Sequence, residues 1–151
     1  MLCRALALNV ARAWEPDLVI GIATAGVIPG AVIASMLRCD FHAIKISRHG
    51  EEGLEHDEPR ILSAAPHQAA GRRVLIVDEI CTTGETLRMA LAAVRAQRPR
   101  EVRTATSFVK SGQFRPDFFA VETDALVIFP WDRQIATPAG IETNPEYRGL
   151  L

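Results

Sequence analysis

The sequence predicts an α/β domain in which a central, mostly parallel sheet is flanked by helices. Apolar segments of strand length alternate along the chain with segments whose apolar residues recur at helical spacing, and this alternation is typical of a parallel sheet. The chain has 151 residues, which is the usual size of one domain. We therefore expect a single domain over residues 1–151 with one hydrophobic core.

The N-terminal residues 1–14 predict an amphipathic first helix. Asn9 and Arg12 interrupt an apolar run that would otherwise resemble a signal peptide. The expected strands are 18–23, 41–47, 74–77, 101–109 and 125–129, and the expected later helices are 27–37 and 86–96. Residues 114–122 have a mixed pattern, and a polar, proline-containing tail occupies 133–151.

Composition excludes several classes of function. The formal net charge is −1 and the chain has no useful basic run, which disfavours a nucleic-acid partner because phosphate neutralisation needs clustered Lys and Arg. The three cysteines lie far apart without a CxxC pair, a pattern that fits a reducing cytoplasm better than a disulfide framework or a zinc site. No apolar stretch approaches the ~18 residues that span a bilayer, so we expect no membrane partner.

The stretch VLIVDEICTTGETL, residues 74–87, carries the chemistry. Two carboxylates, Asp78 and Glu79, follow a buried strand, and a loop rich in hydroxyls leads into the next helix. Free backbone N–H groups and the positive end of a helix dipole form an anion site without any lysine. Gly84 lets the backbone close around a tetrahedral anion. The loop therefore predicts a phosphate site.

The two carboxylates cannot face that phosphate, because like charges repel. Ionised oxygens accept strong hydrogen bonds from a neighbouring diol. A ligand with a phosphate at one end and a ribose diol close by satisfies both halves of the stretch, which indicates a 5-phosphoribosyl group. The simpler alternative is a capped strand–loop–helix unit with solvated acidic residues.

This stretch resembles the phosphoribosyl-pyrophosphate (PRPP) motif of type I phosphoribosyltransferases, with its apolar strand, two acidic residues and TGxT-type loop. The resemblance implies the fold of that family, with a small or reduced hood over the base. It also implies that Asp78 and Glu79 are the catalytic residues that hold the ribose hydroxyls. The residues that it assigns to the ribose and the 5′-phosphate together are Asp78, Glu79, Cys81, Thr82, Thr83, Gly84, Glu85 and Thr86.

Two further segments are similar to parts of that family. GIATAGVIPGA resembles its pyrophosphate loop, with Thr24, Ala25 and Gly26 as the contact residues, although many purine-specific members carry Arg at the position of Thr24. ALVIFPWD resembles the base-binding segment of the xanthine–guanine and hypoxanthine branch. The base residues that this resemblance implies are Lys110, Leu126 and Val127. For Trp131 we favour a packed aromatic of the core or an interface over a base-stacking role.

Residues 48–72 match by position the flexible loop that closes over the reacting ribose and excludes water. His49, His56 and His67 lie in or near this segment, and we expect them to be ordinary surface histidines. The segment contains no lysine, which counts against the orotate branch.

Thr82 departs from the purine branch, whose members usually carry an Asp there to handle the proton near the base. A threonine hydroxyl cannot act as a general base at neutral pH without an activating neighbour. The substrate's own acidity, another group, or a base other than a 6-oxopurine would each account for this departure.

The resemblance implies a PRPP-dependent transferase that converts a purine-like base to a nucleoside 5′-monophosphate with release of pyrophosphate. Mg²⁺ would be bound mainly by substrate oxygens, with Asp78 or Asp132 as the protein ligand. A homodimer or tetramer is expected. The alternatives are a non-catalytic PRPP-sensing regulator, a transferase for orotate or adenine, and a phosphate-binding protein unrelated to PRPP.

Overall fold

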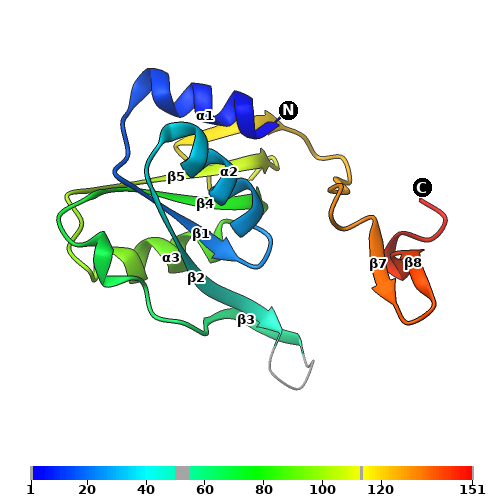
Figure 1. Ribbon diagram of the computed structural model, residues 1–151. Coiled ribbons are helices and arrows are strands. Elements are labelled where there is room, and N and C mark those ends of the chain that lie inside the picture. Colours follow the sequence, from blue (N-terminus) through cyan, green and yellow to red (C-terminus); the bar gives the residue numbers. More distant parts are fainter. Residues whose placement is uncertain (1, 50–54, 113, 151) are drawn as a thin grey trace.

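The main sheet of the computed structural model, which describes residues 2–49, 55–112 and 114–150, has the strand order β3-β2-β1-β4-β5-β6 (Figure 1). Its strands are β1 (Leu18–Ala23), β2 (Asp40–His49), β3 (Glu55–Ile61), β4 (Arg73–Cys81), β5 (Glu101–Val109) and β6 (Phe118–Glu122). Neighbouring strands run parallel except β3, which is antiparallel to β2. The predicted α/β fold with a mostly parallel sheet is confirmed.

The helices cover both faces of this sheet. α1 (Leu2–Ala13) and α2 (Val27–Leu37) lie on one face, and α3 (Glu85–Arg95) lies on the other (Figure 1). All three agree with the predicted helices to within about a turn. Pro29 lies in the first turn of α2, where its missing N–H has no helical partner to lose. No helix in the described part of the chain is long and apolar enough to cross a membrane.

The central strand β4 explains why its sequence is a continuous apolar run. Val74 and Ile76 belong to the core beneath α3, whereas Leu75 and Val77 belong to the core beneath α1 and α2. All four are fully buried. A strand covered by helices on both faces needs apolar residues at every position, which is the pattern of residues 74–77.

The strand order reverses between β1 and β4. The connection through α2 leads from β1 to β2 on one side, and the connection through α3 leads from β4 to β5 on the other. The loops that leave the carboxyl ends of β1 and β4 therefore diverge, and they open a crevice in which α/β proteins bind ligands. These are the two loops that the sequence assigned to pyrophosphate and 5′-phosphate.

The prediction of a strand at 125–129 was wrong. These residues have no regular structure, and the edge of the sheet is β6, which comes from the segment of mixed pattern. Leu126 is 63% exposed, whereas Phe129 is buried against Phe108. The apolar run thus serves to bury one aromatic ring rather than to extend the sheet.

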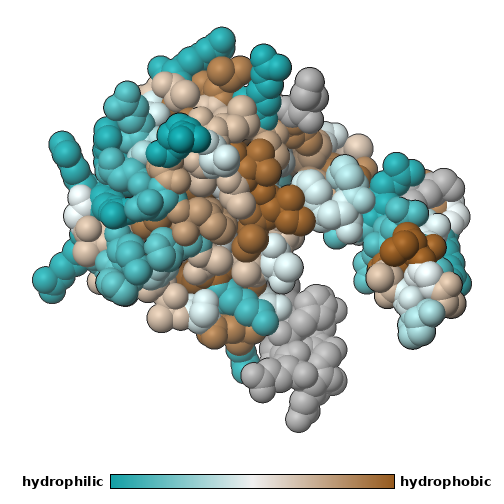
Figure 2. All heavy atoms as spheres, in the orientation of Figure 1, coloured by the Kyte–Doolittle hydropathy of each residue, from teal (hydrophilic) through white to brown (hydrophobic). Residues whose placement is uncertain are grey.

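The tail and the described parts of the 48–72 segment contain more regular structure than expected. β7 (Gln134–Thr137) and β8 (Gly140–Thr143) form an antiparallel hairpin, followed by the 3-10 helix η2 (Pro145–Tyr147). Figure 1 shows this hairpin set apart from the main sheet, and Figure 2 shows an exposed apolar spot on it. Its exposed apolar residues include Ile141, at 66%.

Within 48–72, the residues of β3 pair with β2, and η1 (His67–Ala69) forms a 3-10 turn. The segment is therefore not a loop throughout. His67 is exposed, as expected of a surface histidine. The predictions for the side chains of His49 and His56, and for residues 50–54, lie outside the described residues.

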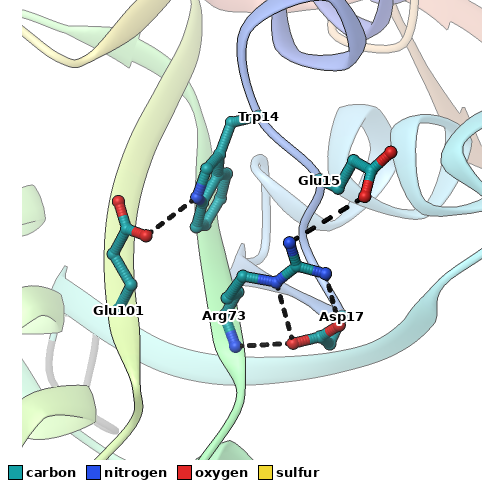
Figure 3. Close-up of polar contacts among 5 residues, drawn as sticks. All are labelled: Trp14, Glu15, Asp17, Arg73 and Glu101. Carbon is teal, nitrogen blue, oxygen red and sulfur yellow. Dashed lines mark hydrogen bonds and ion pairs between the residues drawn. The ribbon is translucent and has the colours of Figure 1, made fainter.

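Polar contacts join the first connection to β4 and β5 at the amino-terminal edge of the sheet (Figure 3). The Arg73 guanidinium donates to Asp17 Oδ1 at 3.1 Å, and the Arg73 backbone N–H donates to Asp17 Oδ2 at 2.9 Å. Trp14 Nε1 donates to Glu101 Oε2 at 3.0 Å. This edge lies opposite the crevice, so these contacts stabilise the scaffold away from the candidate site.

Candidate functional site

Strand β4 continues beyond the point at which the sequence predicted its end. Asp78, Ile80 and Cys81 still pair with residues of β5, so the strand ends at Cys81 rather than at Val77. Backbone pairing does not depend on the charge of the side chains, which is why the ladder extends through the acidic pair. The loop itself is short, because α3 begins at Glu85.

A pocket of ≈ 290 Å³ lies at this end of β4 and is the candidate site. Its lining consists of Asp78, Ile80, Cys81, Thr82, Thr83, Gly84, Glu85, Thr86 and Leu87. The hydroxyl-bearing Thr82 and Thr83 are exposed, and the first turn of α3 leaves backbone N–H groups without helical partners. Hydroxyls and backbone N–H groups at the start of a helix together suit an anion site.

Cys81 and Glu79 are placed differently from the other residues predicted to bind the ribose and the 5′-phosphate. Cys81 is 2% exposed and packs in the core beneath α3, where burial raises the pKa of its thiol. It therefore supports the pocket from below as an apolar group. Glu79 is not among the residues that line the pocket.

Arg88 and Phe114 contact the loop, and the sequence analysis missed both. Arg88 Nη1 donates to the carbonyl oxygen of Thr83 at 3.2 Å, and the guanidinium lies 5.1 Å from the centre of the Phe114 ring. A positive charge thus borders a phosphate-type loop that has none of its own. Helical spacing was the available signal, since residue 88 lies one turn beyond the residues that open α3.

The turn at Thr24–Gly26 lies directly against β4. A Cβ added at Gly26 would lie 2.6 Å from the carbonyl oxygen of Val77 and 2.9 Å from the Cα of Asp78. Only a residue without a side chain fits there, so the turn reaches the same end of the sheet as the pocket. The fold thus brings the first predicted loop beside the second.

Burial raises the pKa values of both acidic residues. Asp78 is half-buried, and desolvation raises its pKa to about 7, although the Glu79 backbone N–H donates to its Oδ1 at 2.8 Å. Desolvation also raises the pKa of Glu79 to about 7, against a hydrogen bond from Trp131 that lowers it. Both groups are therefore poised to change protonation when a ligand or cation arrives.

The candidate base residues border the same region. The Lys110 backbone N–H donates to the carbonyl oxygen of Cys81 at 2.9 Å, which places Lys110 next to the loop. A Cβ added at Gly112 would lie 3.1 Å from the Thr82 oxygen. Val127 is half-buried and Leu126 is exposed. Their contacts with a base stay predictions.

Trp131 stacks on Phe129 but is 37% exposed, so it is not a core residue. The two rings stack with their centres 5.1 Å apart, and Phe129 meets Phe108 edge-on at 5.5 Å. The indole Nε1 of Trp131 donates to Glu79 Oε1 at 2.6 Å. The sequence indicated neither the acceptor nor the contact between these two segments.

The carboxylates fit a magnesium ion that takes most of its ligands from a substrate. Among the described residues, no three His, Cys, Asp or Glu side chains gather into a metal site. Mg²⁺ commonly binds through one or two carboxylates plus substrate phosphates and water. Asp78 offers such a carboxylate at the pocket wall, and Asp132, whose pKa burial raises, lies near Glu79.

We predict that Gly84→Ala destabilises the protein far more than Gly71→Ala. Both glycines have a positive φ, of +80° and +70°, but only at Gly84 would a Cβ meet another group, the Phe114 side chain at 2.3 Å. The left-handed backbone costs each alanine about 1 kcal/mol, and the clash adds about 2 kcal/mol at position 84. Urea unfolding of both variants measures the difference, and equal losses would contradict the packing described.

We predict that Asp78→Asn raises the free energy of unfolding at pH 8. The raised pKa means that folded Asp78 keeps its proton between pH 3.8 and about 7 while the unfolded chain releases it, so stability falls through this window. An uncharged amide avoids that loss, which is on the order of 4 kcal/mol for a pKa raised from 3.8 to about 7. Urea unfolding at pH 5 and pH 8 should show the gain growing with pH. A variant less stable than the wild type at pH 8 would refute this account.

Comparison with known proteins agrees with this geometry. The family model described as phosphoribosyl transferase domain matches residues 1–139. A xanthine-guanine phosphoribosyltransferase of Gluconobacter oxydans is 30% identical over 118 residues, which cover 76% of this chain and 67% of that protein. The transcriptional regulator GfcR of Archaeoglobus fulgidus is 31% identical over 96 residues, which cover 64% of this chain and 49% of the regulator.

Among solved structures, the purine phosphoribosyltransferase of Pyrococcus horikoshii superposes with a TM-score of 0.74 at 26% identity, covering 86% of each chain. The family match spans most of the chain, and it includes both the turn against β4 and the pocket at the start of α3. The chain belongs to the phosphoribosyl transferase domain family.

Proposed function

We propose that the protein transfers a 5-phosphoribosyl group from PRPP to a purine-like base, with release of pyrophosphate, in nucleotide salvage. The observation that carries this proposal is the pocket in which Asp78, the threonine hydroxyls and the start of α3 line one cavity. That combination suits a ligand with both a hydroxyl-bearing sugar and a phosphate. The xanthine-guanine and purine phosphoribosyltransferases among its relatives support a purine-like acceptor.

Each part of the crevice has a role in this proposal. The backbone N–H groups at the start of α3 bind the 5′-phosphate, together with the hydroxyls of Thr82, Thr83 and Thr86. Asp78 and Glu79 accept hydrogen bonds from the ribose hydroxyls. The turn at 24–26 holds the pyrophosphate through its backbone.

The base-side roles rest on the segments that border the loop. Lys110 donates to the exocyclic oxygen of the base, and Leu126 and Val127 flank its ring. Leu126 is exposed in the free protein, so a bound base would cover apolar surface there. Burial of that surface contributes to binding.

Catalysis rests on positioning and on electrostatic stabilisation of the departing pyrophosphate. When bound, Mg²⁺ would neutralise charge that develops on the pyrophosphate, and Asp78 or Asp132 would be its protein ligand. Asp78 loses its proton as the ligand binds, because hydroxyl donors and positive charge replace the solvation that folding removed. The 48–72 segment closes over the reacting ribose and excludes water.

A second candidate is a PRPP-sensing regulator on the same fold. The GfcR relative supports it, although this chain spans only about half of that regulator. Thr82 also supports it, since a regulator needs no group to handle a proton at the base. The net charge of −1 counts against direct binding of nucleic acid. Orotate and adenine remain the alternative bases, and a cytoplasmic dimer or tetramer remains the expected state.

We predict that the protein with PRPP, Mg²⁺ and a panel of bases forms nucleotide and pyrophosphate. Guanine, hypoxanthine, xanthine, adenine and orotate make up the panel, and chromatography with a pyrophosphate assay measures the products. Asp78→Asn should lower kcat/KM about 10- to 100-fold through loss of a charged hydrogen bond. Asp40→Asn is the control, because Asp40 starts β2 at the opposite edge of the sheet and pairs with Arg72.

Each result of this assay points to one candidate function. PRPP binding without turnover on any base would exclude the transferase and favour the sensor. Absence of PRPP binding would exclude both. Equal kcat/KM in the Asp78→Asn and Asp40→Asn variants would remove Asp78 from the site.

We predict that PRPP with Mg²⁺ binds more tightly at pH 8 than at pH 6. The pKa values of Asp78 and Glu79 are raised to about 7, so both must release protons to accept the ribose hydroxyls. Calorimetry in buffers of different ionisation enthalpy should detect this proton release. Asp78→Asn should flatten the pH dependence and so separate it from the ionisation of PRPP itself. The same slope in that variant would contradict the assignment.

A further inference from the structure

We propose that Arg88 is a positioning residue for the loop before α3: it holds the peptide between Thr83 and Gly84 so that the N–H of this peptide faces the pocket. The inference rests on the proposed function and goes beyond it, because Arg88 is not among the residues that line the pocket. Its basis is the hydrogen bond from Arg88 Nη1 to the carbonyl oxygen of Thr83, at 3.2 Å.

The peptide between Thr83 and Gly84 has two accessible orientations. Gly84 has φ 80° and ψ 5°, which are the values of the glycine position in a type II turn. In a type I turn the same peptide is turned over, so that its carbonyl and its N–H exchange sides. Glycine adopts positive and negative φ about equally readily, so the glycine itself does not select one orientation.

The orientation of this peptide decides whether it attracts or repels a phosphate. The C=O and the N–H of a planar trans peptide point in opposite directions. A carbonyl bonded to Arg88, outside the pocket lining, therefore directs the Gly84 N–H toward the pocket that Thr83 and Gly84 both line. With the peptide turned over, the carbonyl oxygen would face the anion and repel it.

Arg88 bonds both peptides that flank Gly84. Its backbone N–H donates to the carbonyl oxygen of Gly84 at 2.9 Å, and its side chain donates to the carbonyl oxygen of Thr83. The first bond belongs to the opening turn of α3 and forms whatever side chain stands at position 88. The second bond depends on the guanidinium, so a substitution at this position removes the restraint on the Thr83 carbonyl alone.

Phe114 holds the guanidinium in place and packs on the same glycine. The guanidinium carbon lies 5.1 Å from the centre of the Phe114 ring. A Cβ added at Gly84 would lie 2.3 Å from the Cβ of Phe114, so this side chain packs directly on the loop. A planar guanidinium stacks on an aromatic face and donates from its edge at the same time, which an ammonium group does not do.

The test compares Arg88→Met with the matched control Arg95→Met. We expect Arg88→Met to raise the KM for PRPP about tenfold, as loss of a charged hydrogen bond does, with a smaller change in kcat and an unchanged KM for the base. Arg88 is exposed on α3 and methionine is a good helix former, so the variant should fold. Arg95 is also exposed, two turns further along α3, and Arg95→Met removes the same charge without changing the KM.

Arg88→Lys separates the hydrogen bond from the charge. It keeps the positive charge and removes the planar guanidinium, so it should raise the KM for PRPP nearly as much as Arg88→Met. A KM equal to that of the wild type in Arg88→Lys would overturn the inference, because charge alone would then suffice. Equal KM values in Arg88→Met and Arg95→Met would overturn it as well.

A readout without PRPP keeps this inference distinct from the proposed function. Inorganic phosphate added to the free protein should shift the NMR resonance of the Gly84 amide, and Arg88→Met should need about tenfold more phosphate for the same shift. A Gly84 resonance insensitive to phosphate, or equal phosphate affinities, would overturn the inference even if the protein is active. Failure to bind PRPP, with phosphate binding that depends on Arg88, would instead overturn the proposed function.

Discussion

The desolvation of two adjacent carboxylates on β4 is the constraint on which the rest of this site depends. Backbone pairing with β5 continues through Asp78 to Cys81 and carries both acidic side chains to the rim of a core that is apolar on both faces of the sheet. Burial raises both pKa values to about 7. A group in this state costs stability in the free protein and gains the most from a ligand that offers hydroxyl donors or a cation.

The two carboxylates meet this constraint in different ways. Asp78 lines the open pocket, and its Oδ1 accepts a hydrogen bond from the neighbouring Glu79 backbone N–H. Glu79 lies outside the pocket lining and accepts a hydrogen bond from the indole of Trp131. The Asp78 carboxylate is thus open to donors from a ligand, while the Glu79 carboxylate already has a side-chain donor from the protein.

Two glycines and an arginine shape the loops that border the pocket. Gly26 lets the first turn reach β4, and Gly84 leaves room for Phe114 against the loop. Arg88 then lies over the Phe114 ring and bonds the loop backbone at Thr83. These contacts hold the loop open as an anion site while placing positive charge at its border. The loops after β1 and β4 both border the crevice because the strand order reverses between these two strands.

The sequence by itself determined the strands β1, β2, β4 and β5, the three helices and the position of the loop between β4 and α3, because each depends on periodicity or spacing within a short segment. Local patterns could not distinguish β6 from the apolar run at 125–129, since both are short and partly apolar, and only pairing with β5 decided between them. The hairpin in the tail was missed because its two strands, β7 and β8, have only four residues each, too few for a clear pattern. The bond between Trp131 and Glu79 was decided by the tertiary structure alone, because it joins residues 52 positions apart whose proximity depends on how the chain packs around β4.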